Sequence, residues 1–505
     1  MNPAVSNALL ARLSDFVAAQ MGLNFPDGRW ADLQRGLQAA SREFGFAEAG
    51  ACAEWLLSAP LTKRQIEILA SVLTVGETYF FREKKSLEIL AQQILPELIQ
   101  ARRGGEQRLR LWSAGCCTGE EPYSLAILLH RILPDLPHWN ITLLATDINP
   151  RFLRKAAAGK FGQWSFRDAP AWLQADYFTR TGPGQWTIHP EIRRMVSFSH
   201  LNLAEDAYPS LLNDTNAMDV ILCRNVMMYF TPAQAAKVIQ NFHHCLVEGG
   251  WLLVSPSEAS HVLFPQYVAA NFPEAILYRK DSAPARAIYP LKTEPDSFPP
   301  LNTGPDAAPE PDADTEFRAE DDEAVSPKAA EPSPAAPVST PYSEARACYE
   351  QGRYAEATEL LLRGHSGQGL PEPRALPLLA RAFANQGKLK EAFDWCNRAI
   401  AADKLNPATH YLRATILQEQ GAEEEAVRSL QRALYLDPDF VLAHFDLGNL
   451  AMRQGRLAEA RRHGENALRL LRQRQPDELV PESEGITAGR LGELIEAQME
   501  SEALP

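Results

Sequence analysis

Residues 110–124, Arg-Leu-Trp-Ser-Ala-Gly-Cys-Cys-Thr-Gly-Glu-Glu-Pro-Tyr-Ser, constrain the fold more than any other stretch of the chain. The alternating apolar residues that open it are typical of the end of a strand, and Pro122 suits the first turn of the helix that follows. Between them lie Gly115 and Gly119, which let the backbone approach a ligand closely because they carry no Cβ. The stretch therefore predicts the strand–turn–helix unit that opens a nucleotide-type site in an α/β sheet.

The same stretch indicates which kind of ligand the turn would accept. It lacks both the Gly-x-Gly-x-x-Gly dinucleotide pattern and the Gly-Lys-Ser/Thr of a phosphate-binding loop. Glu120 and Glu121 stand at the helix N-terminus, where their carboxylates would repel a phosphate. S-adenosylmethionine fits such a site, since it carries a sulfonium, an ammonium and a ribose but no phosphate. An ordinary helix whose acids complement its dipole explains this stretch, taken alone, equally well.

Composition and charge argue against several classes of protein. The chain has 505 residues, enough for two to four domains, and a net charge of −14 that argues against a nucleic-acid or anionic-membrane binder. It shows no secretory signal and no apolar run of membrane-spanning length. The seven cysteines have no CxxC spacing, which argues against a zinc site and fits a reducing compartment. We therefore expect a cytoplasmic protein without metal, nucleic-acid partner or direct membrane insertion.

Two kinds of structure are expected before residue 281. Residues 1–75 carry apolar faces at helical spacing and predict an N-terminal helical domain of three or four helices with a basic surface. Residues 76–280 alternate strand and helix patterns and predict an α/β domain. An aromatic-rich insertion near residues 161–195 holds a Thr-Gly-Pro-Gly turn, which predicts a small antiparallel hairpin.

The second half of the chain changes character. Residues 281–340 are rich in proline and acids and predict a disordered linker. In residues 341–475 a glycine followed five residues later by an alanine recurs every 34 or 35 residues, the period of about four tetratricopeptide (TPR) repeats. Such an all-α solenoid offers a concave surface to peptides or partner helices. Residues 476–505 form a polar tail with a helical pattern at 488–499.

Three further stretches place polar residues beside apolar runs. Asp147 ends an apolar run 28 residues beyond Gly119, roughly where nucleotide-binding folds place a carboxylate for the ribose. Arg224 and Asn225 end the run that begins at residue 219, although polar residues after a buried strand are common. The aromatic residues 79–81 precede Arg82 and, taken alone, are better explained as core with a snorkelling arginine.

Taken together, five stretches in order resemble the CheR-type chemotaxis-receptor methyltransferases over about residues 1–280; they are residues 77–83, 112–124, 145–148, 202–203 and 223–230. The resemblance implies a class I, Rossmann-like methyltransferase domain preceded by a helical domain. It also implies S-adenosyl-L-methionine as cofactor, S-adenosyl-L-homocysteine as product, and glutamate side chains of methyl-accepting chemoreceptor cytoplasmic domains as acceptors. A glutamate is already ionised at neutral pH, so the reaction needs no strong general base.

The resemblance also implies roles for individual residues. Arg82 and Tyr229 would face the reacting methyl group as catalytic residues, and Asp147 would hold the ribose hydroxyls. Gly76 departs from the pattern, because many relatives carry asparagine there, so a side-chain contact is lost or replaced by backbone. The residues implied to bind the cofactor are Gly76, Thr78, Arg82, Gly115, Glu121, Asp147, Asn202, Leu203, Arg224 and Asn225.

Two alternatives compete with a glutamate methyltransferase. One is a methyltransferase with another acceptor, such as a small molecule, which the helical domain and the repeats disfavour. The other is a catalytically weak, cofactor-binding scaffold whose repeats carry the function, which the intact Arg82, Asp147 and Tyr229 disfavour. Under the leading hypothesis the repeats bind receptors or other signalling-complex proteins and recruit the enzyme to membrane receptor clusters.

Overall fold

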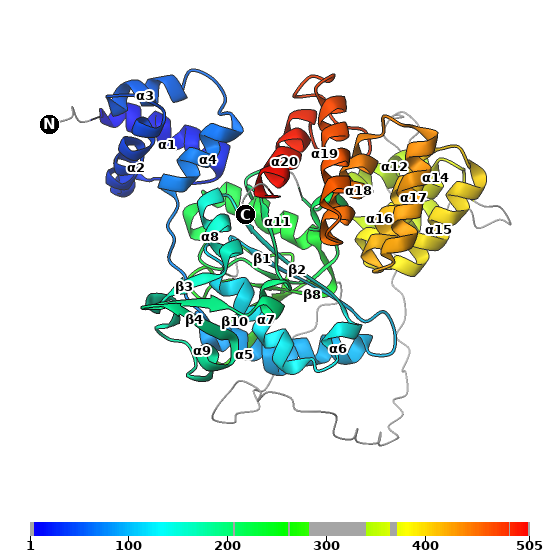
Figure 1. The fold of residues 1–505 in the computed structure, drawn as a ribbon, viewed down its shortest axis with the longest axis horizontal. Helices are drawn as coiled ribbons and strands as arrows, with labels where there is room; N and C mark the ends of the chain where they lie inside the picture. Colours follow the sequence, from blue (N-terminus) through cyan, green and yellow to red (C-terminus); the bar gives the residue numbers. More distant parts are fainter. Residues whose placement is uncertain are drawn as a thin grey trace, which may run out of the picture.

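The computed structural model describes residues 5–205, 208–260, 263–281, 340–363, 371–483 and 485–502. A helical unit comes first, a mixed α/β unit second and a run of helix pairs last (Figure 1). Most of the predicted linker, residues 281–340, lies outside the described residues. Within the described parts, no helix combines the length and the apolar character needed to cross a membrane.

The N-terminal unit is helical and rests on the α/β unit. A buried apolar cluster holds its helices together, among them Leu13 of α1, Leu33 of α2 and Leu69 of α4. The Asn149 side chain of the α/β unit donates a hydrogen bond to the Thr74 hydroxyl at 2.8 Å, just after α4 ends. The elements are α1 (Asn7–Met21), η1 (Asp27–Arg29), α2 (Trp30–Glu43), α3 (Ala49–Leu56) and α4 (Lys63–Leu73).

A seven-stranded sheet forms the centre of the α/β unit, with strand order β6-β2-β1-β7-β8-β10-β9. The five strands from β6 to β8 are parallel, whereas β10 pairs antiparallel with both β8 and β9. This arrangement confirms the predicted Rossmann-like α/β class, in which ligands bind at the carboxyl ends of the central strands. The strands are β1 (Arg108–Ala114), β2 (Asn140–Asp147), β6 (Ser197–His200), β7 (Met218–Leu222), β8 (Leu246–Leu253), β9 (Val268–Phe272) and β10 (Ala275–Arg279).

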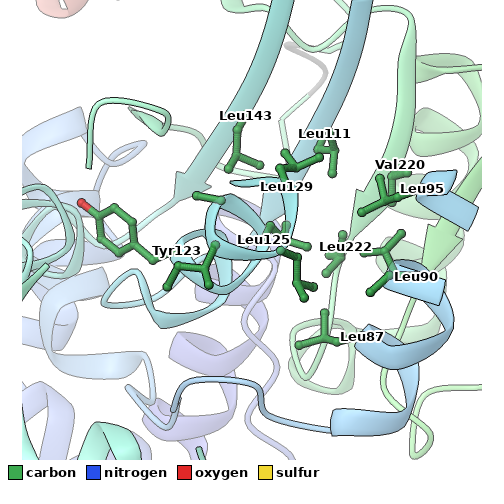
Figure 2. Packing of buried hydrophobic residues seen from close by; sticks show 14 of the residues in the cluster. Leu87, Leu90, Leu95, Leu111, Tyr123, Leu125, Leu129, Leu143, Val220 and Leu222 are labelled. Atoms are coloured by element: carbon green, nitrogen blue, oxygen red, sulfur yellow. The ribbon is translucent and has the colours of Figure 1, made fainter. Parts of the chain in front are cut away.

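Helices cover both faces of this sheet. On one face, Leu125 and Leu129 pack with Leu90 against strand residues such as Leu111 and Leu222 (Figure 2). On the other face, Trp112, Ile221, Val238 and Phe242 belong to a second buried cluster. The helices are α5 (Lys84–Ile89), the π-helical η2 (Leu90–Ile94), α6 (Leu95–Arg102), α7 (Glu120–Ile132), η3 (Leu136–His138), α8 (Pro150–Ala158), η5 (Leu211–Asn213), η6 (Met227–Tyr229) and α11 (Pro232–Cys245).

The insertion folds as a small sheet with strand order β3-β5-β4, so the segment predicted to hold a hairpin contains three strands. Phe161, Phe166 and Phe178 pack against Phe80 there, which explains the aromatic composition of the insertion. The elements are β3 (Lys160–Gly162), η4 (Gln163–Phe166), α9 (Trp172–Tyr177), β4 (Phe178–Gly182), β5 (Gln185–Ile188) and α10 (Pro190–Arg193).

Two strands of the sheet have ends that their apolar pattern does not mark. The alternating pattern at 196–203 forms a strand only over Ser197–His200, because Leu201 and Asn202 leave the ladder to reach the carboxyl edge. Strand β8 begins at Leu246, although the continuous apolar run in this part of the sequence begins only at Trp251. Its pairing with β7 shifts register between Met218 and Val220, and this bulge accommodates Gly249 and Gly250.

The C-terminal helices form antiparallel pairs, which confirms the predicted all-α repeat array. A glycine at positive φ separates the two helices of each pair. A last helix occupies the predicted polar tail. The helices are α12 (Pro341–Glu350), α13 (Tyr354–Arg363), α14 (Ala375–Asn385), α15 (Leu389–Ala402), α16 (Pro407–Glu419), α17 (Glu423–Leu436), α18 (Val441–Arg453), α19 (Leu457–Leu471) and α20 (Ala488–Glu502).

Candidate cofactor and active site

A cavity that is open to solvent lies at the carboxyl ends of β1, β2 and β7. The N-terminal unit closes one of its sides with Met21 and Arg29, and Leu73 adds an apolar wall. Its lining combines apolar side chains with a few carboxylates and cations, as ligand sites commonly do. It lies where ligands bind in open α/β sheets.

The cavity brings together residues from all five motif stretches. Both predicted catalytic side chains, Arg82 and Tyr229, line it. Gly76 is not among the lining residues; a Cβ built on it would lie 2.8 Å from Cζ of Phe152, which does line the cavity. The predicted cofactor-binding residues that line the cavity are Thr78, Arg82, Gly115, Glu121, Asp147, Asn202, Leu203, Arg224 and Asn225.

The glycine-bearing turn requires both of its glycines. Gly115 has φ 82°, and a Cβ there would lie 2.4 Å from Cγ2 of Val226. Gly119 has φ 97°, and its Cβ would lie 2.9 Å from Cβ of Ala156. The backbone N–H groups of Gly115 and Cys116 both donate to the carbonyl of Thr146, which fixes the turn against the end of β2. A side chain at Gly115 would therefore collide with Val226, and one at Gly119 would collide with α8.

Asp147 is held as a buried acceptor at the end of β2. Its Oδ2 accepts the backbone N–H of Cys117 at 2.9 Å and its Oδ1 accepts that of Asn149 at 2.8 Å. Burial raises the pKa of Asp147 to about 6, while these backbone hydrogen bonds act in the opposite direction. The group is therefore ionised at neutral pH and suited to accept hydrogen bonds from hydroxyl groups in the cavity.

A buried arginine ties two of the motifs together. The Arg224 side chain is 2% exposed, and its Nη1 lies 3.4 Å from Oε2 of Glu121. Its Nε donates to Oε2 of Glu83 at 3.2 Å, and its Nη2 donates to the carbonyl of Arg82. Burial raises the pKa of Glu121, and Arg224 and the hydroxyl of Ser113 oppose that rise. Through these contacts residues 77–83 are fixed against the end of β7.

Arg82 and Tyr229 reach the cavity from different segments. Nη1 of Arg82 donates to the carbonyl of Glu77 at 2.5 Å. The Tyr229 carbonyl accepts the N–H of Asn24 at 2.7 Å, and the Arg29 guanidinium lies 5.3 Å from the centroid of the tyrosine ring. The neighbouring Phe80 and Phe81 are buried, so the aromatic stretch before Arg82 supplies core as well as a wall of the site.

Sequence reasoning missed two contributions to this site. The loop between α1 and α2 carries Asn24 and Arg29 to the cavity, and no local pattern marks either residue. Glu258, which follows β8, is 7% exposed and accepts hydrogen bonds from the backbone of Asn225 and Met228. In the sequence, Glu258 is marked only as an acid in Ser-Pro-Ser-Glu, shortly after an apolar run.

The residues present fit S-adenosylmethionine better than a phosphate-bearing nucleotide. Glu120 is buried at the N-terminus of α7, where its carboxylate accepts the hydroxyls of Thr118 and Ser165. Glu121 next to it lines the cavity. Two carboxylates at the helix N-terminus disfavour a phosphate there, and Glu121 supplies negative charge to the cavity. The Asp147 carboxylate adds an acceptor for ribose hydroxyls.

Comparison with known proteins assigns the family. The CheR methyltransferase, SAM binding domain matches residues 76–267, and tetratricopeptide repeat families match residues 342–407, 416–455 and 441–474. Chemotaxis protein methyltransferase 1 of Pseudomonas aeruginosa is 36% identical over 219 residues, which cover 42% of this chain and 77% of that protein. This chain belongs to the CheR methyltransferase family. Its methyl donor is S-adenosylmethionine.

Further relatives of this CheR-family protein differ in how far they match. Chemotaxis protein methyltransferase 2 of Vibrio cholerae is 33% identical over 216 residues, 43% of this chain and 73% of that protein. The probable biofilm formation methyltransferase WspC of Pseudomonas aeruginosa is 27% identical over 409 residues, 80% of this chain and 86% of that protein. The WspC match extends well beyond residue 280, so it includes part of the repeat array.

Proposed function

We propose that this CheR-family enzyme methylates glutamate carboxylates on the cytoplasmic domains of methyl-accepting chemoreceptor-like proteins. The cofactor supplies an electrophilic methyl group, which a carboxylate oxygen accepts to give a methyl ester and S-adenosylhomocysteine. The repeat array contributes protein contacts, either to receptors or to other proteins of the signalling complex. The enzyme then works in the cytoplasm, at membrane receptor clusters to which these contacts recruit it.

One observation carries this proposal: Arg82 and Tyr229 line the same cavity as the Asp147 carboxylate. Arg82 provides a permanent positive charge that attracts a glutamate carboxylate without protonating it. The Tyr229 hydroxyl has no hydrogen bond to any described residue and is therefore available to orient the acceptor. An acceptor that is already ionised needs alignment and exclusion of water rather than proton removal.

The other lining residues would divide the work of holding the cofactor. Asp147 accepts the ribose hydroxyls, and Glu121 supplies negative charge toward the cationic part of the ligand. Arg224 keeps Glu121 and residues 77–83 in place, because it contacts Glu121, Glu83 and the carbonyl of Arg82. Asn202 and Leu203 form the wall next to the end of β6.

The test is transfer of label from methyl-labelled S-adenosylmethionine into candidate receptor cytoplasmic domains. We expect label that is released by mild base, as carboxyl methyl esters are, and lost when the modified receptor glutamates are replaced by alanine. The Asp147→Ala enzyme serves as a matched negative control. Base-stable label would indicate another type of acceptor, and cofactor binding without any transfer would favour the scaffold alternative.

A further inference from the structure

The repeat array lies against the methyltransferase unit (Figure 1), at the edge of the sheet where β1 and β2 begin. Consecutive turns between paired helices make this contact. A Cβ built on Gly352 would lie 2.4 Å from Cγ of His244, and one built on Gly387 would lie 3.2 Å from Cγ1 of Val247. The equivalent turn glycine of the last pair, Gly455, has no atom within 4 Å of its Cβ position. Only some of the repeats therefore contact the methyltransferase unit, so the contact is not a general consequence of the repeat fold.

A buried carboxylate of the array lies at the centre of this contact. Glu419, at the end of α16, is 7% exposed and accepts a hydrogen bond from Nη2 of Arg108 at 2.8 Å. Arg110 lies 3.4 Å from the same oxygen, and the Asn216 side chain donates to the other at 2.8 Å. Asn140 donates to the Glu419 backbone carbonyl at 2.7 Å. Removing the Glu419 side chain would leave two buried guanidinium groups without this partner, which is costly, so we expect its loss to weaken the contact.

The loop between β6 and β7 connects this contact to the cofactor cavity. Leu211 in the loop packs against the apolar cluster of α14 and α16. Asn216 near its end donates to Glu419. At the other end of the loop, the Tyr208 hydroxyl donates to the carbonyl of Leu203 at 2.8 Å, and Leu203 lines the cavity. The array therefore contacts the segment 208–217, and Tyr208 of that segment contacts Leu203 of the cofactor cavity.

A second connection runs through the last helix. Nη2 of Arg490 in α20 lies 3.3 Å from Nδ1 of His200 at the end of β6. Nε2 of His200 lies 3.0 Å from the carbonyl of Ile148. Because Arg490 only donates and the Ile148 carbonyl only accepts, both contacts fit the neutral imidazole with its proton on Nε2. Ile148 follows Asp147 and also lines the cavity.

We propose that the repeat array uses this surface to bind the methyltransferase unit of its own chain, and that the docked array holds the cofactor-binding segments around Asn202, Leu203 and Asp147 in place. The partner at this surface is the edge containing Arg108 and Arg110, whose charges complement Glu419. Undocking the array weakens S-adenosylmethionine binding. This proposal depends on S-adenosylmethionine binding in the cavity, and it does not depend on which acceptor the enzyme methylates.

The decisive comparison is between Gly352→Ala and Gly455→Ala in the full chain. Both glycines have nearly the same left-handed φ, 71° and 73°, so both variants carry the same backbone strain. Only the first places a methyl group against His244. Calorimetric titration with S-adenosylmethionine measures affinity, and hydrogen exchange of residues 208–217 reports docking.

We expect Gly352→Ala to weaken cofactor binding by at least about fivefold, the lower range of typical coupling between sites, and to speed exchange in residues 208–217. Gly455→Ala should leave both unchanged. A second pair of variants tests the same contact. Glu419→Ala should weaken cofactor binding and speed exchange in residues 208–217, whereas the solvent-facing Glu424→Ala should change neither. Faster exchange with unchanged affinity would overturn the coupling, and identical behaviour of the two glycine variants would overturn the docking. Cofactor binding is measured without acceptor, so loss of the proposed receptor activity would not affect this result.

Discussion

The carboxylate of Glu258 accepts the backbone N–H of Asn225 at 2.8 Å and so stabilises a left-handed residue at the edge of the cofactor cavity. The same oxygen accepts the N–H and the hydroxyl of Ser255, and the other accepts the N–H of Met228 at 3.1 Å. Asn225 has φ 58°, a conformation that asparagine tolerates better than most residues. Glu258 therefore positions the segment that carries Arg224, Asn225 and Tyr229.

Replacing Glu258 by glutamine tests this positioning role. The amide removes the charge and replaces one accepting oxygen with a donor, so a buried N–H loses its partner at a cost of about 1–3 kcal/mol in the free energy of unfolding. We expect a similar loss in S-adenosylmethionine affinity, about tenfold, measured by titration. The exposed Glu274→Gln is the control. Normal affinity in a Glu258→Gln protein of reduced stability would limit Glu258 to a structural role.

Cofactor affinity should depend on pH through Asp147. Burial raises its pKa to about 6, so the group is protonated below that pH in the free enzyme and loses acceptor capacity for the ribose hydroxyls. Proton binding then competes with the cofactor, and the dissociation constant should rise as pH falls through 6 and stay level above about 7. Titrations at several pH values measure this profile. Asp147→Asn should bind weakly at every pH; the same slope in that variant would assign the titration to another group.

Substitutions at Tyr229 and at Asp147 should affect different properties, turnover in the first case and cofactor binding in the second. Without its hydroxyl, Tyr229→Phe loses a hydrogen bond to a charged acceptor, which is typically worth about 1.5–3 kcal/mol, or tenfold to a hundredfold in turnover. Its cofactor affinity should change little, whereas Asp147→Ala should mainly weaken cofactor binding. Single-turnover assays at saturating cofactor, together with titrations, measure the two properties. Equal loss of both properties in each variant would contradict this division.

Much of the candidate site was predictable because its residues follow apolar strands. Asp147 is the last residue of β2, and Arg224 lies two residues beyond the end of β7. Neighbouring parallel strands bring their carboxyl ends to one edge of the sheet, so the two residues meet there. Gly115 and Gly119 were predictable for a related reason, since the turn after the first strand has no room for side chains. The repeat array was predictable from its period, because each helix pair buries the same small residues.

Other parts depend on tertiary contacts that leave no local pattern. Asn24 reaches the site only because the N-terminal unit rests on the loop that carries Tyr229. In the sequence, Glu419 resembles any acid near a helix end. It is buried because it contacts Arg108 and Arg110, which lie more than 300 residues away in the chain. Strand β9 was missed because its antiparallel pairing with β10, and not its own composition, makes it a strand.

Gly76 and Phe152 lie so close together that asparagine, which the family resemblance implies at position 76, would fit there only if the ring of Phe152 moved. A Cβ at residue 76 would lie 2.8 Å from Cζ and 3.1 Å from Cε1 of Phe152, so an asparagine there must displace a ring that lines the cavity. We expect Gly76→Asn to weaken S-adenosylmethionine binding about tenfold. Gly76→Asn with Phe152→Ala should bind more tightly than the two separate losses predict, because the truncated side chain makes room.

The double-mutant cycle should therefore show a coupling within the 0.5–3 kcal/mol range typical of residues in contact. Gly50→Asn provides a matched control, since no neighbouring atom lies within 4 Å of its Cβ position. Additive losses in the cycle would mean that Gly76 acts through its backbone alone, as expected if its N–H or carbonyl contacts the cofactor directly. Coupling, by contrast, would show that Phe152 occupies the space an asparagine side chain would need, so that glycine and phenylalanine must be exchanged together.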